Sequence, residues 1–102
     1  MGKKERSVAH YLIDEGESRG CLVEKLHCED ERGHPDYLVT FPSGAMKKIE
    51  TKAKDGELSR YQMRIHERYA TRRCFIRVVY TREQVDEFYN DFHREWLGWE
   101  LL

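Results

Sequence analysis

Three charged residues on either side of a short turn could together hold a divalent metal ion. Asp36 begins an apolar run, and Glu50 and Lys52 follow the turn at residues 42–44. If the flanking segments are paired strands, Asp36 lies opposite Thr51, give or take one residue. Glu50 and Lys52 are two residues apart, so their side chains leave the same face of the strand. The spacing predicts two carboxylates and an ammonium group in one place.

This combination of groups suits hydrolysis of a phosphate ester. Carboxylate oxygens are the ligands that Mg²⁺ prefers, and Mg²⁺ keeps several waters and accepts phosphate oxygens. A bound ion could lower the pKa of a water and offset charge on the phosphate, while Lys52 orients the water or the phosphate. The structural alternative is a Glu50–Lys52 pair on a solvated sheet face, worth only ~0.2–1 kcal/mol.

Apolar periodicity predicts one α/β domain with elements in the order α-β-β-β-α-β-α. Ser59 with Gln62, and Thr81 with Gln84, have the form of helix capping boxes. The last helix is expected to bury a stripe that extends to Phe92 and Trp96. The predicted helices are Lys4–Arg19, Ser59–Ala70 and a segment from Thr81, and the predicted strands are Cys21–Leu26, Tyr37–Phe41, Ala45–Ala53 and Cys74–Tyr80.

Composition limits the class of protein. The 102 residues have 36% charged and 39% hydrophobic side chains, enough for a single core, so one domain over 1–102 is expected. The sequence has no run of 18 apolar residues for a membrane span and no apolar stretch after Met1 for a secretory signal. Its three cysteines are odd in number and unclustered, which fits reduced thiols. A cytoplasmic location is expected.

The net charge of −1 conceals a basic middle segment. Residues 45–82 contain eleven Lys and Arg against four Asp and Glu, a net charge of +7, between acidic flanks. A polyanion-binding face and an ordinary solvated surface are both open interpretations. Three of the arginines recur every four residues and could follow a phosphate backbone as one helical stripe. The candidate nucleic-acid-binding residues are Lys47, Lys48, Lys54, Arg60, Arg64 and Arg68, with Arg72 and Arg73 nearby.

The order of these motifs resembles a known nuclease signature. Gly33-His34-Pro35-Asp36, followed by Glu50-Thr51-Lys52, resembles the PD-(D/E)xK nucleases. The turn Asp55-Gly56 and the helix start Leu58-Ser59-x-x-Gln62 narrow the resemblance to the VRR-NUC family. The match extends from the first helix to the strand at Cys74–Tyr80. It implies a restriction-endonuclease-like core with a mixed central sheet.

The resemblance also implies roles for individual residues. Asp36 and Glu50 would be metal ligands, with the Thr51 backbone carbonyl as a third, and Lys52 would be the catalytic lysine. Gln62 matches a glutamine near the family's active site, and this role is compatible with capping. The family has a glutamate on its first helix, for which Glu5 is favoured over Glu15.

Two positions depart from the family pattern without removing a ligand. His34 stands where the family often has an apolar residue, and Arg60 stands where a proline is common. His34 could reach a phosphate or the metal, but an exposed loop residue without a role is the favoured interpretation.

The resemblance implies a Mg²⁺- or Mn²⁺-dependent DNA endonuclease. Stand-alone members from bacteria and their viruses form homodimers that cut four-way (Holliday) junctions, so a homodimer acting on branched DNA is expected. The apolar run from Phe92 to Leu102 could cover the core or contact a second copy. The rival hypotheses are a nuclease for flap, splayed-arm or single-stranded DNA, and a non-catalytic DNA-binding or partner-binding module with a vestigial site.

Overall fold

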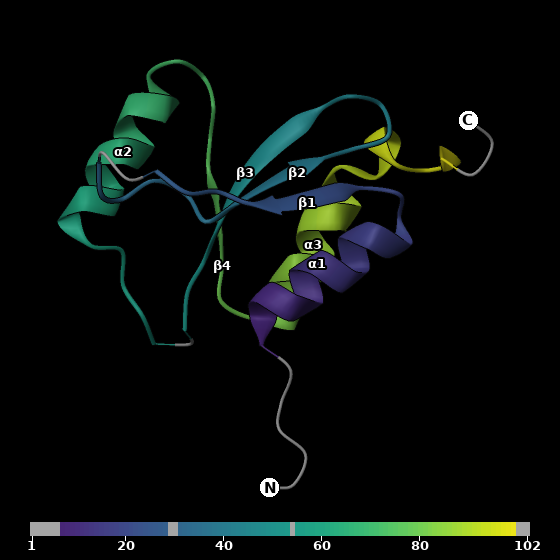
Figure 1. Ribbon diagram of the computed structural model, residues 1–102, viewed down its shortest axis with the longest axis horizontal. Coiled ribbons are helices and arrows are strands. Elements are labelled where there is room, and N and C mark those ends of the chain that lie inside the picture. The colour runs from purple at the N-terminus through teal and green to yellow at the C-terminus, as the bar shows by residue number, and fades with distance from the viewer. Residues whose placement is uncertain (1–6, 29–30, 54, 100–102) are drawn as a thin grey trace, which may run out of the picture.

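The computed structural model describes residues 7–28, 31–53 and 55–99, and it confirms the predicted order of elements (Figure 1). A four-stranded mixed sheet carries three α-helices, with a short 3₁₀ helix after the last of them. The elements are α1 (Val8–Ser18), β1 (Leu22–Lys25), β2 (Tyr37–Thr40), β3 (Met46–Thr51), α2 (Arg60–Ala70), β4 (Arg77–Val79), α3 (Arg82–Asp91) and η1 (His93–Glu95).

The strands follow one another across the sheet in sequence order. β1–β2 and β2–β3 are antiparallel, whereas β3 and β4 are parallel. A parallel pair needs a crossover connection, and α2 lies within it. Tyr37 pairs with Ile49 rather than with Glu50, so the hairpin register differs by one residue from the expected one, within the stated allowance. If this pairing is extended by one residue beyond Tyr37 and Ile49, Asp36 lies opposite Glu50.

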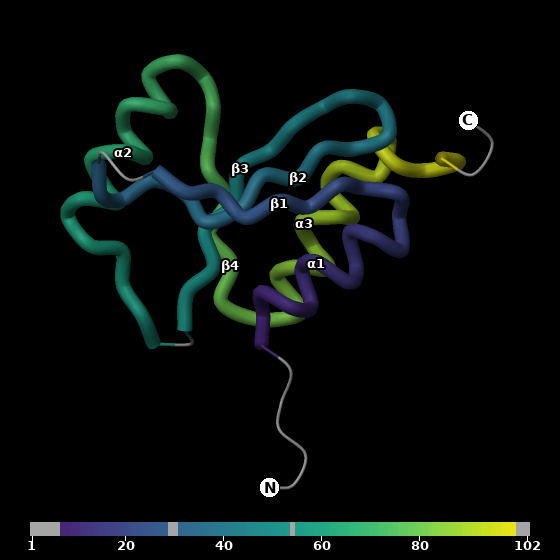
Figure 2. Tube along the Cα trace, viewed as in Figure 1, coloured from purple at the N-terminus to yellow at the C-terminus, as the bar shows by residue number. Residues whose placement is uncertain are grey.

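The hydrophobic core lies between the sheet and the helices α1 and α3. These helices pack against each other, α1 contacts β1, and α3 contacts β4. Leu12, Val39, Ile49, Val79 and Phe88 are fully buried there. Because side chains alternate along a strand, Ile49 enters this core and Glu50 leaves the sheet on the opposite face. In the Cα trace α2 lies at the far end of the molecule from η1 (Figure 2).

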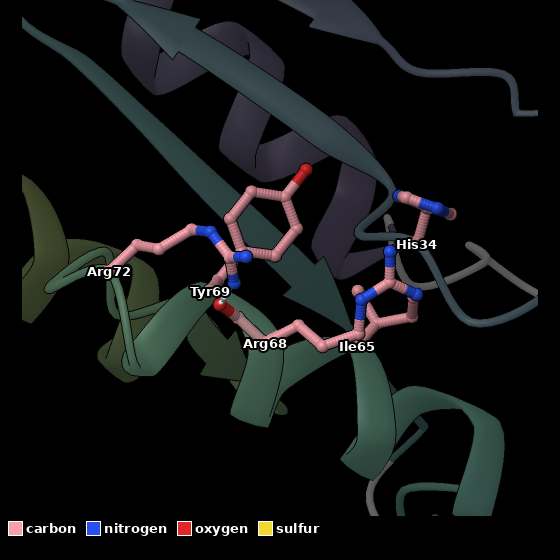
Figure 3. A pocket seen from close by; sticks show the side chains of 5 residues that line it. All are labelled: His34, Ile65, Arg68, Tyr69 and Arg72. Carbon is pink, nitrogen blue, oxygen red and sulfur yellow. Dashed lines mark hydrogen bonds between the residues drawn. The ribbon is translucent and has the colours of Figure 1, made fainter.

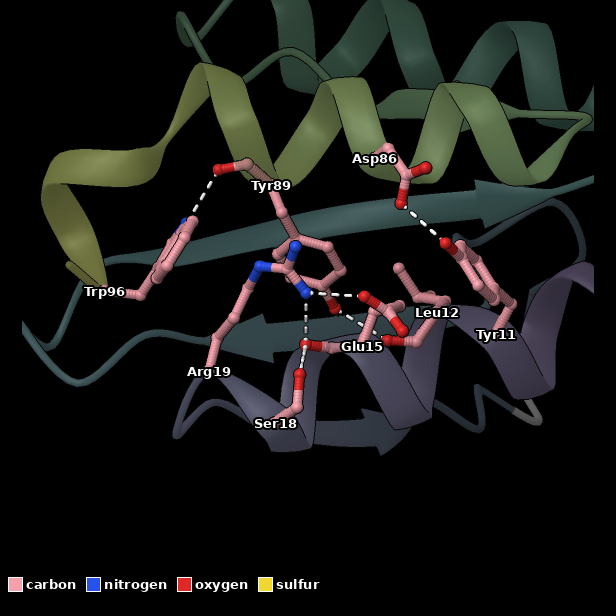
Figure 4. A network of polar contacts seen from close by, with 8 residues as sticks. All are labelled: Tyr11, Leu12, Glu15, Ser18, Arg19, Asp86, Tyr89 and Trp96. Carbon is pink, nitrogen blue, oxygen red and sulfur yellow. Dashed lines mark hydrogen bonds and ion pairs between the residues drawn. The ribbon is translucent and has the colours of Figure 1, made fainter. Parts of the chain in front are cut away.

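A polar network joins α1 to α3 beside the core (Figure 4). Tyr11 donates to Asp86 at 2.8 Å, and Tyr89 donates to the Leu12 backbone carbonyl at 2.7 Å. The Arg19 guanidinium lies 4.9 Å from the Tyr89 ring centroid. The Tyr89 bond is buried and the Tyr11 bond is partly buried, and they help to fix how the two helices sit on the sheet, since an unpaired buried polar group is costly.

All four strands and the first two helices are shorter than predicted. The first helix begins at Val8 after the cap Ser7, whose hydroxyl accepts from the His10 backbone at 3.1 Å, rather than at Lys4. β4 spans Arg77–Val79, shorter than predicted. The middle helix begins after Ser59, and its capping box is present as expected.

The last helix is shorter than its apolar stripe suggested. It ends at Asp91, and Phe92 has φ −112° and ψ 32°, outside helical geometry. Trp96 therefore lies beyond η1, where its indole N–H donates back to the Tyr89 carbonyl at 2.7 Å. The second capping box is incomplete, because Gln84 Oε1 accepts from the Tyr80 backbone rather than from Thr81.

The C-terminal run covers the core as far as the described residues extend. Trp96 packs against the core, and the Trp99 ring lies over Gly20. Leu97 stays exposed. Within residues 7–28, 31–53 and 55–99, no helix has the length and apolar character needed to cross a bilayer.

Candidate active site

Asp36 is held against the start of the proposed metal-binding motif. Its Oδ2 accepts hydrogen bonds from the Thr51 backbone N–H at 3.0 Å and from the Thr51 hydroxyl at 3.1 Å. Its own carbonyl accepts from the Leu26 N–H at 2.7 Å, which extends the β1–β2 pairing. The side chain is thus tied to β3 and the backbone to β1, so its position depends on the whole antiparallel part of the sheet.

Glu50 is a buried carboxylate directly beside Asp36. It is 1% exposed, and it is the only buried charged residue in the part of the chain that the structure describes. Burial, followed by the negative charge of Asp36 and the interaction between the two carboxyl groups, raises the pKa of Glu50 to about 8. The nearby Lys52 ammonium lowers this pKa only in part. The Asp36 carboxyl group therefore opposes the ionisation of Glu50 from the neighbouring strand.

Gln62 links the second carboxylate with the lysine. Its side-chain N–H donates to Glu50 Oε2 at 2.8 Å, and its Oε1 accepts from Lys52 Nζ at 3.2 Å. The same Oε1 accepts from the Ser59 backbone N–H at 2.8 Å, and Ser59 Oγ accepts from the Gln62 backbone N–H at 3.1 Å. The capping role and the site role predicted for Gln62 thus coexist in one side chain.

Gly33 lets the loop before Asp36 approach α2 closely. A Cβ at this position would lie 2.4 Å from the Tyr61 carbonyl oxygen and 2.8 Å from the Gln62 backbone nitrogen. Its φ of +93° is also one that residues with a side chain rarely adopt. The glycine of the Gly-x-Pro-Asp motif therefore places the Asp36 loop against the start of the helix that carries Gln62.

His66 belongs to this site and was missed in the sequence. It lies one turn after Gln62 on α2, and its Nε2 is 3.7 Å from Glu50 Oε1. Burial lowers the pKa of His66 and so favours the neutral imidazole. The signal was available, because residues four apart on a helix share a face.

Asp36 and Glu50 are suited to binding a divalent cation, because one buried oxygen of Glu50 lacks a partner. Glu50 Oε1 is buried without a hydrogen-bond partner among the described residues, and buried carboxylates of this kind are normally paired or bind metals. No three His, Cys, Asp or Glu side chains form a metal cluster in the described ranges. Asp36 and Glu50 would therefore hold an ion together with backbone or water oxygens, the coordination expected of Mg²⁺ or Mn²⁺.

Some of the predicted basic residues lie on other surfaces. Lys47 and Lys48 leave opposite faces of β3, because Lys47 Nζ lies 4.6 Å from the Phe92 ring centroid and Lys48 Nζ lies 5.1 Å from that of Tyr69. Lys48 therefore shares the Glu50 face. Arg60 and Arg64 are exposed. Each is two residues from Gln62, a rotation of about 200° around the helix axis, so both lie on the side of α2 opposite Gln62.

A basic pocket lies further along α2 (Figure 3). It has a volume of about 260 Å³. The Arg68 guanidinium contacts the Glu31 carboxylate at 2.7 Å on its rim, and His34 Nε2 lies 3.3 Å from the same residue. His34 is half-buried rather than a free loop side chain. The pocket is lined by His34, Ile65, Arg68, Tyr69 and Arg72.

The first-helix glutamate is not settled by these contacts. Glu15 Oε1 accepts from Arg19 at 2.9 Å, in the network that joins α1 to α3 (Figure 4), so its carboxylate is already engaged there. Glu5 lies outside the described residues, as does Lys54.

Comparisons with known proteins agree with this geometry. No family model matches the chain. Among curated proteins, the chain is 34% identical to "Putative nuclease p44" of Acyrthosiphon pisum secondary endosymbiont phage 1 over 65 residues, 64% of this chain and 70% of that protein. Among solved structures, a chain described as "VRR_NUC domain" superposes with a TM-score of 0.77 and 34% identity, covering 83% of this chain and 92% of that one. The similarity in both sequence and fold shows that this chain belongs to the VRR-NUC family.

Proposed function

We propose that the protein is a Mg²⁺- or Mn²⁺-dependent DNA endonuclease that hydrolyses phosphodiester bonds. The observation that carries the proposal is the position of Asp36 on the strand beside the buried Glu50, together with the Gln62 side chain that joins Glu50 to Lys52. A merely structural ion pair needs neither a buried carboxylate beside a second carboxylate nor an amide held between the acid and the lysine. Family membership and the name of the phage relative support the same activity.

Each side chain of the candidate site has a separate role in the proposed hydrolysis. Asp36 and Glu50 would hold the divalent ion, which would offset charge on the phosphate and lower the pKa of a water. Lys52 orients the attacking water or the scissile phosphate with its ammonium group. The water oxygen forms a bond to phosphorus and gives up a proton to solvent while the bond from phosphorus to the leaving oxygen breaks, and the leaving oxygen takes a proton from solvent. Gln62 keeps Lys52 and Glu50 at a fixed separation during this step.

The basic side chains beside the site supply the binding energy for nucleic acid. Lys48, His34, Arg68 and Arg72 lie on the face of the sheet that also bears Glu50 or along the adjacent pocket. None belongs to a base-reading motif, so contacts with the phosphate backbone would recognise shape more than sequence. Arg60 and Arg64, on the far side of α2, would contact only DNA that extends past the helix.

The favoured substrate is a four-way DNA junction, cut by a homodimer. This follows from the resemblance to stand-alone VRR-NUC proteins, and two sites related by a two-fold axis suit paired nicks across a junction. Exposed apolar side chains are available for a second copy, among them Met46, Phe75 and Leu97. A flap, splayed arm or single strand is the alternative substrate.

One substrate panel tests the activity. Labelled four-way junction, flap, splayed arm, single strand and linear duplex are each incubated with Mg²⁺, with Mn²⁺ and with a chelator. We expect metal-dependent cutting that is fastest on the junction and is abolished in Lys52→Ala. Binding without cutting under all metal conditions would instead favour the non-catalytic module. Light scattering that shows a monomer at micromolar concentration would contradict the homodimer while leaving the nuclease activity standing.

A further inference from the structure

Two buried atoms without partners face each other at the edge of the candidate site. Glu50 Oε1 and His66 Nε2 are both buried, and neither has a hydrogen-bond partner among the residues that the structure describes. They lie 3.7 Å apart, which is too long for a hydrogen bond. Leaving a buried polar atom unpaired costs stability, so a facing pair suggests that something binds between them.

The surrounding structure fixes both atoms in this arrangement. Gln62 Nε2 holds the other oxygen of Glu50 at 2.8 Å, which turns Oε1 away from Gln62. His66 follows on the same face of α2, and only 16% of its side chain is exposed. Since α2 begins at a complete capping box, the imidazole and the carboxylate approach each other from a helix and a strand that are both anchored.

We propose that His66 is a ligand of the divalent ion held by Glu50, through its Nε2 atom. The proposal rests on the metal dependence proposed above and adds a nitrogen to an otherwise all-oxygen site. Ligand atoms at about 2.0–2.2 Å from one ion lie roughly 3–3.5 Å from each other. The two atoms would therefore need only a small shift to bind the same ion.

The alternative is a proton shared between the two side chains. Such a proton would satisfy both atoms without a metal, since one atom would donate and the other would accept. A shared proton would require the 3.7 Å gap to close, whereas an ion fills it and satisfies both atoms.

A nitrogen ligand changes which metals the site prefers. Mg²⁺ and Ca²⁺ favour oxygen ligands, whereas imidazole suits transition-metal ions. His66 should therefore shift the preference from Mg²⁺ toward Mn²⁺ and later transition metals. No three His, Cys, Asp or Glu side chains within the described ranges already surround one point, so Asp36, Glu50 and His66 would draw together on the ion, and water or substrate oxygens would complete the coordination.

The test measures Mn²⁺ itself, with the full-length chain and without DNA. Pulsed electron paramagnetic resonance of bound Mn²⁺ should show coupling to one imidazole ¹⁴N in the wild type. His66→Ala should lose this coupling. Calorimetry should show that this variant binds Mn²⁺ about tenfold or more weakly than the wild type, while its Mg²⁺ affinity changes less. His34→Ala is the matched control, because His34 is also half-buried beside α2 but lines the neighbouring pocket, and it should keep the coupling. His66→Gln, which keeps a polar side chain of similar length, serves if the alanine variant fails to fold.

Each outcome separates this inference from the proposed function. Mn²⁺ that binds without nitrogen coupling, or coupling that survives in His66→Ala, would overturn the ligand role and leave a metal-dependent nuclease. Failure of the wild type to bind Mn²⁺ by either method, together with absence of DNA cutting, would overturn both.

Discussion

The side-chain amide of Gln62 donates a 2.8 Å hydrogen bond to Oε2 of the buried Glu50. A residue that closes the N-terminal cap of α2 therefore also orients a carboxylate on β3. Gln62 therefore has two roles, capping α2 and orienting Glu50. Mutations at Gln62 and at Ser59 can separate these two roles.

Gln62→Ala should reduce DNA cutting by about tenfold or more, because Glu50 and Lys52 lose their common partner. Ser59→Ala is the matched control: it removes a capping hydrogen bond, at about 0.5–2 kcal/mol, but leaves the Gln62 side chain in place. Single-turnover cleavage rates and urea denaturation measure the two effects. Equal losses of activity in both variants at equal stability would show that Gln62 acts only as a cap.

The stability of the metal-free protein should decline as the pH rises toward about 8. The pKa of Glu50 is raised from 4.5 to about 8 in the folded protein. Between these values the folded state keeps a proton that the unfolded state releases, so the free energy of unfolding falls with increasing pH. Glu50→Gln removes this dependence and should be more stable than the wild type at pH 8, by on the order of a few kcal/mol.

Urea denaturation with a chelator present, from pH 5 to pH 8.5, measures that difference. Glu87→Gln, which alters an exposed glutamate on α3, controls for the loss of one carboxylate. Parallel profiles for the wild type and Glu50→Gln would contradict the assignment of a raised pKa to this group.

Gly33→Ala should disrupt the site more than Gly44→Ala does. Both glycines have positive φ, +93° and +97°, and alanine is strained at each by roughly 1–3 kcal/mol. Only at Gly33 would a Cβ meet the backbone of α2, whereas nothing among the described residues lies within 4 Å at Gly44. We expect Gly33→Ala to be a further ~1–3 kcal/mol less stable and to cut DNA more slowly. Equal losses of stability would show that α2 moves aside without cost.

Arg68→Ala and Arg72→Ala should each weaken DNA binding and reduce its salt dependence. A lost phosphate contact lowers the slope of log K against log salt by about one. Arg94→Ala is the control, since Arg94 lies on η1, away from α2 (Figure 1). Glu31→Gln should have the opposite effect on affinity, because Glu31 neutralises Arg68 at 2.7 Å. Fluorescence anisotropy of labelled junction DNA in a chelator measures all four variants.

The sequence predicted the order of elements because its patterns are local. Ser59 and Gln62 signal a helix start by themselves, and the β-branched and apolar residues from Cys74 to Tyr80 signal a strand. The hairpin register was uncertain by one residue, because loop length alone does not specify the turn geometry. The end of α3 was misjudged because Phe92 and Trp96 continue its apolar spacing, although Trp96 in fact reaches back from a separate turn to Tyr89.

The site was predictable where its residues share a strand or a motif, and not where they meet through the fold. The closeness of Asp36 and Glu50 follows from hairpin pairing. The spacing of four places His66 on the Gln62 face of the helix, but the contact of His66 with Glu50 also depends on how that helix sits across the sheet, which no local pattern encodes. The same holds for Lys47, which adjoins Lys48 in sequence yet lies over Phe92 on the opposite face.

The short connection between β3 and α2 separates the candidate site into two parts along the chain. Glu50 and Lys52 precede residues 53–58, and Gln62 and His66 follow them. A single proteolytic cut within that connection would remove no strand or helix, and the pairing of β3 with β4 and the packing of α1 against α3 would keep both fragments together. The nicked protein would retain its size and most of its fold, yet the amide would no longer be covalently tethered to the carboxylate that it orients. Controlled scission at this point would thus uncouple catalysis from folding without changing an amino acid.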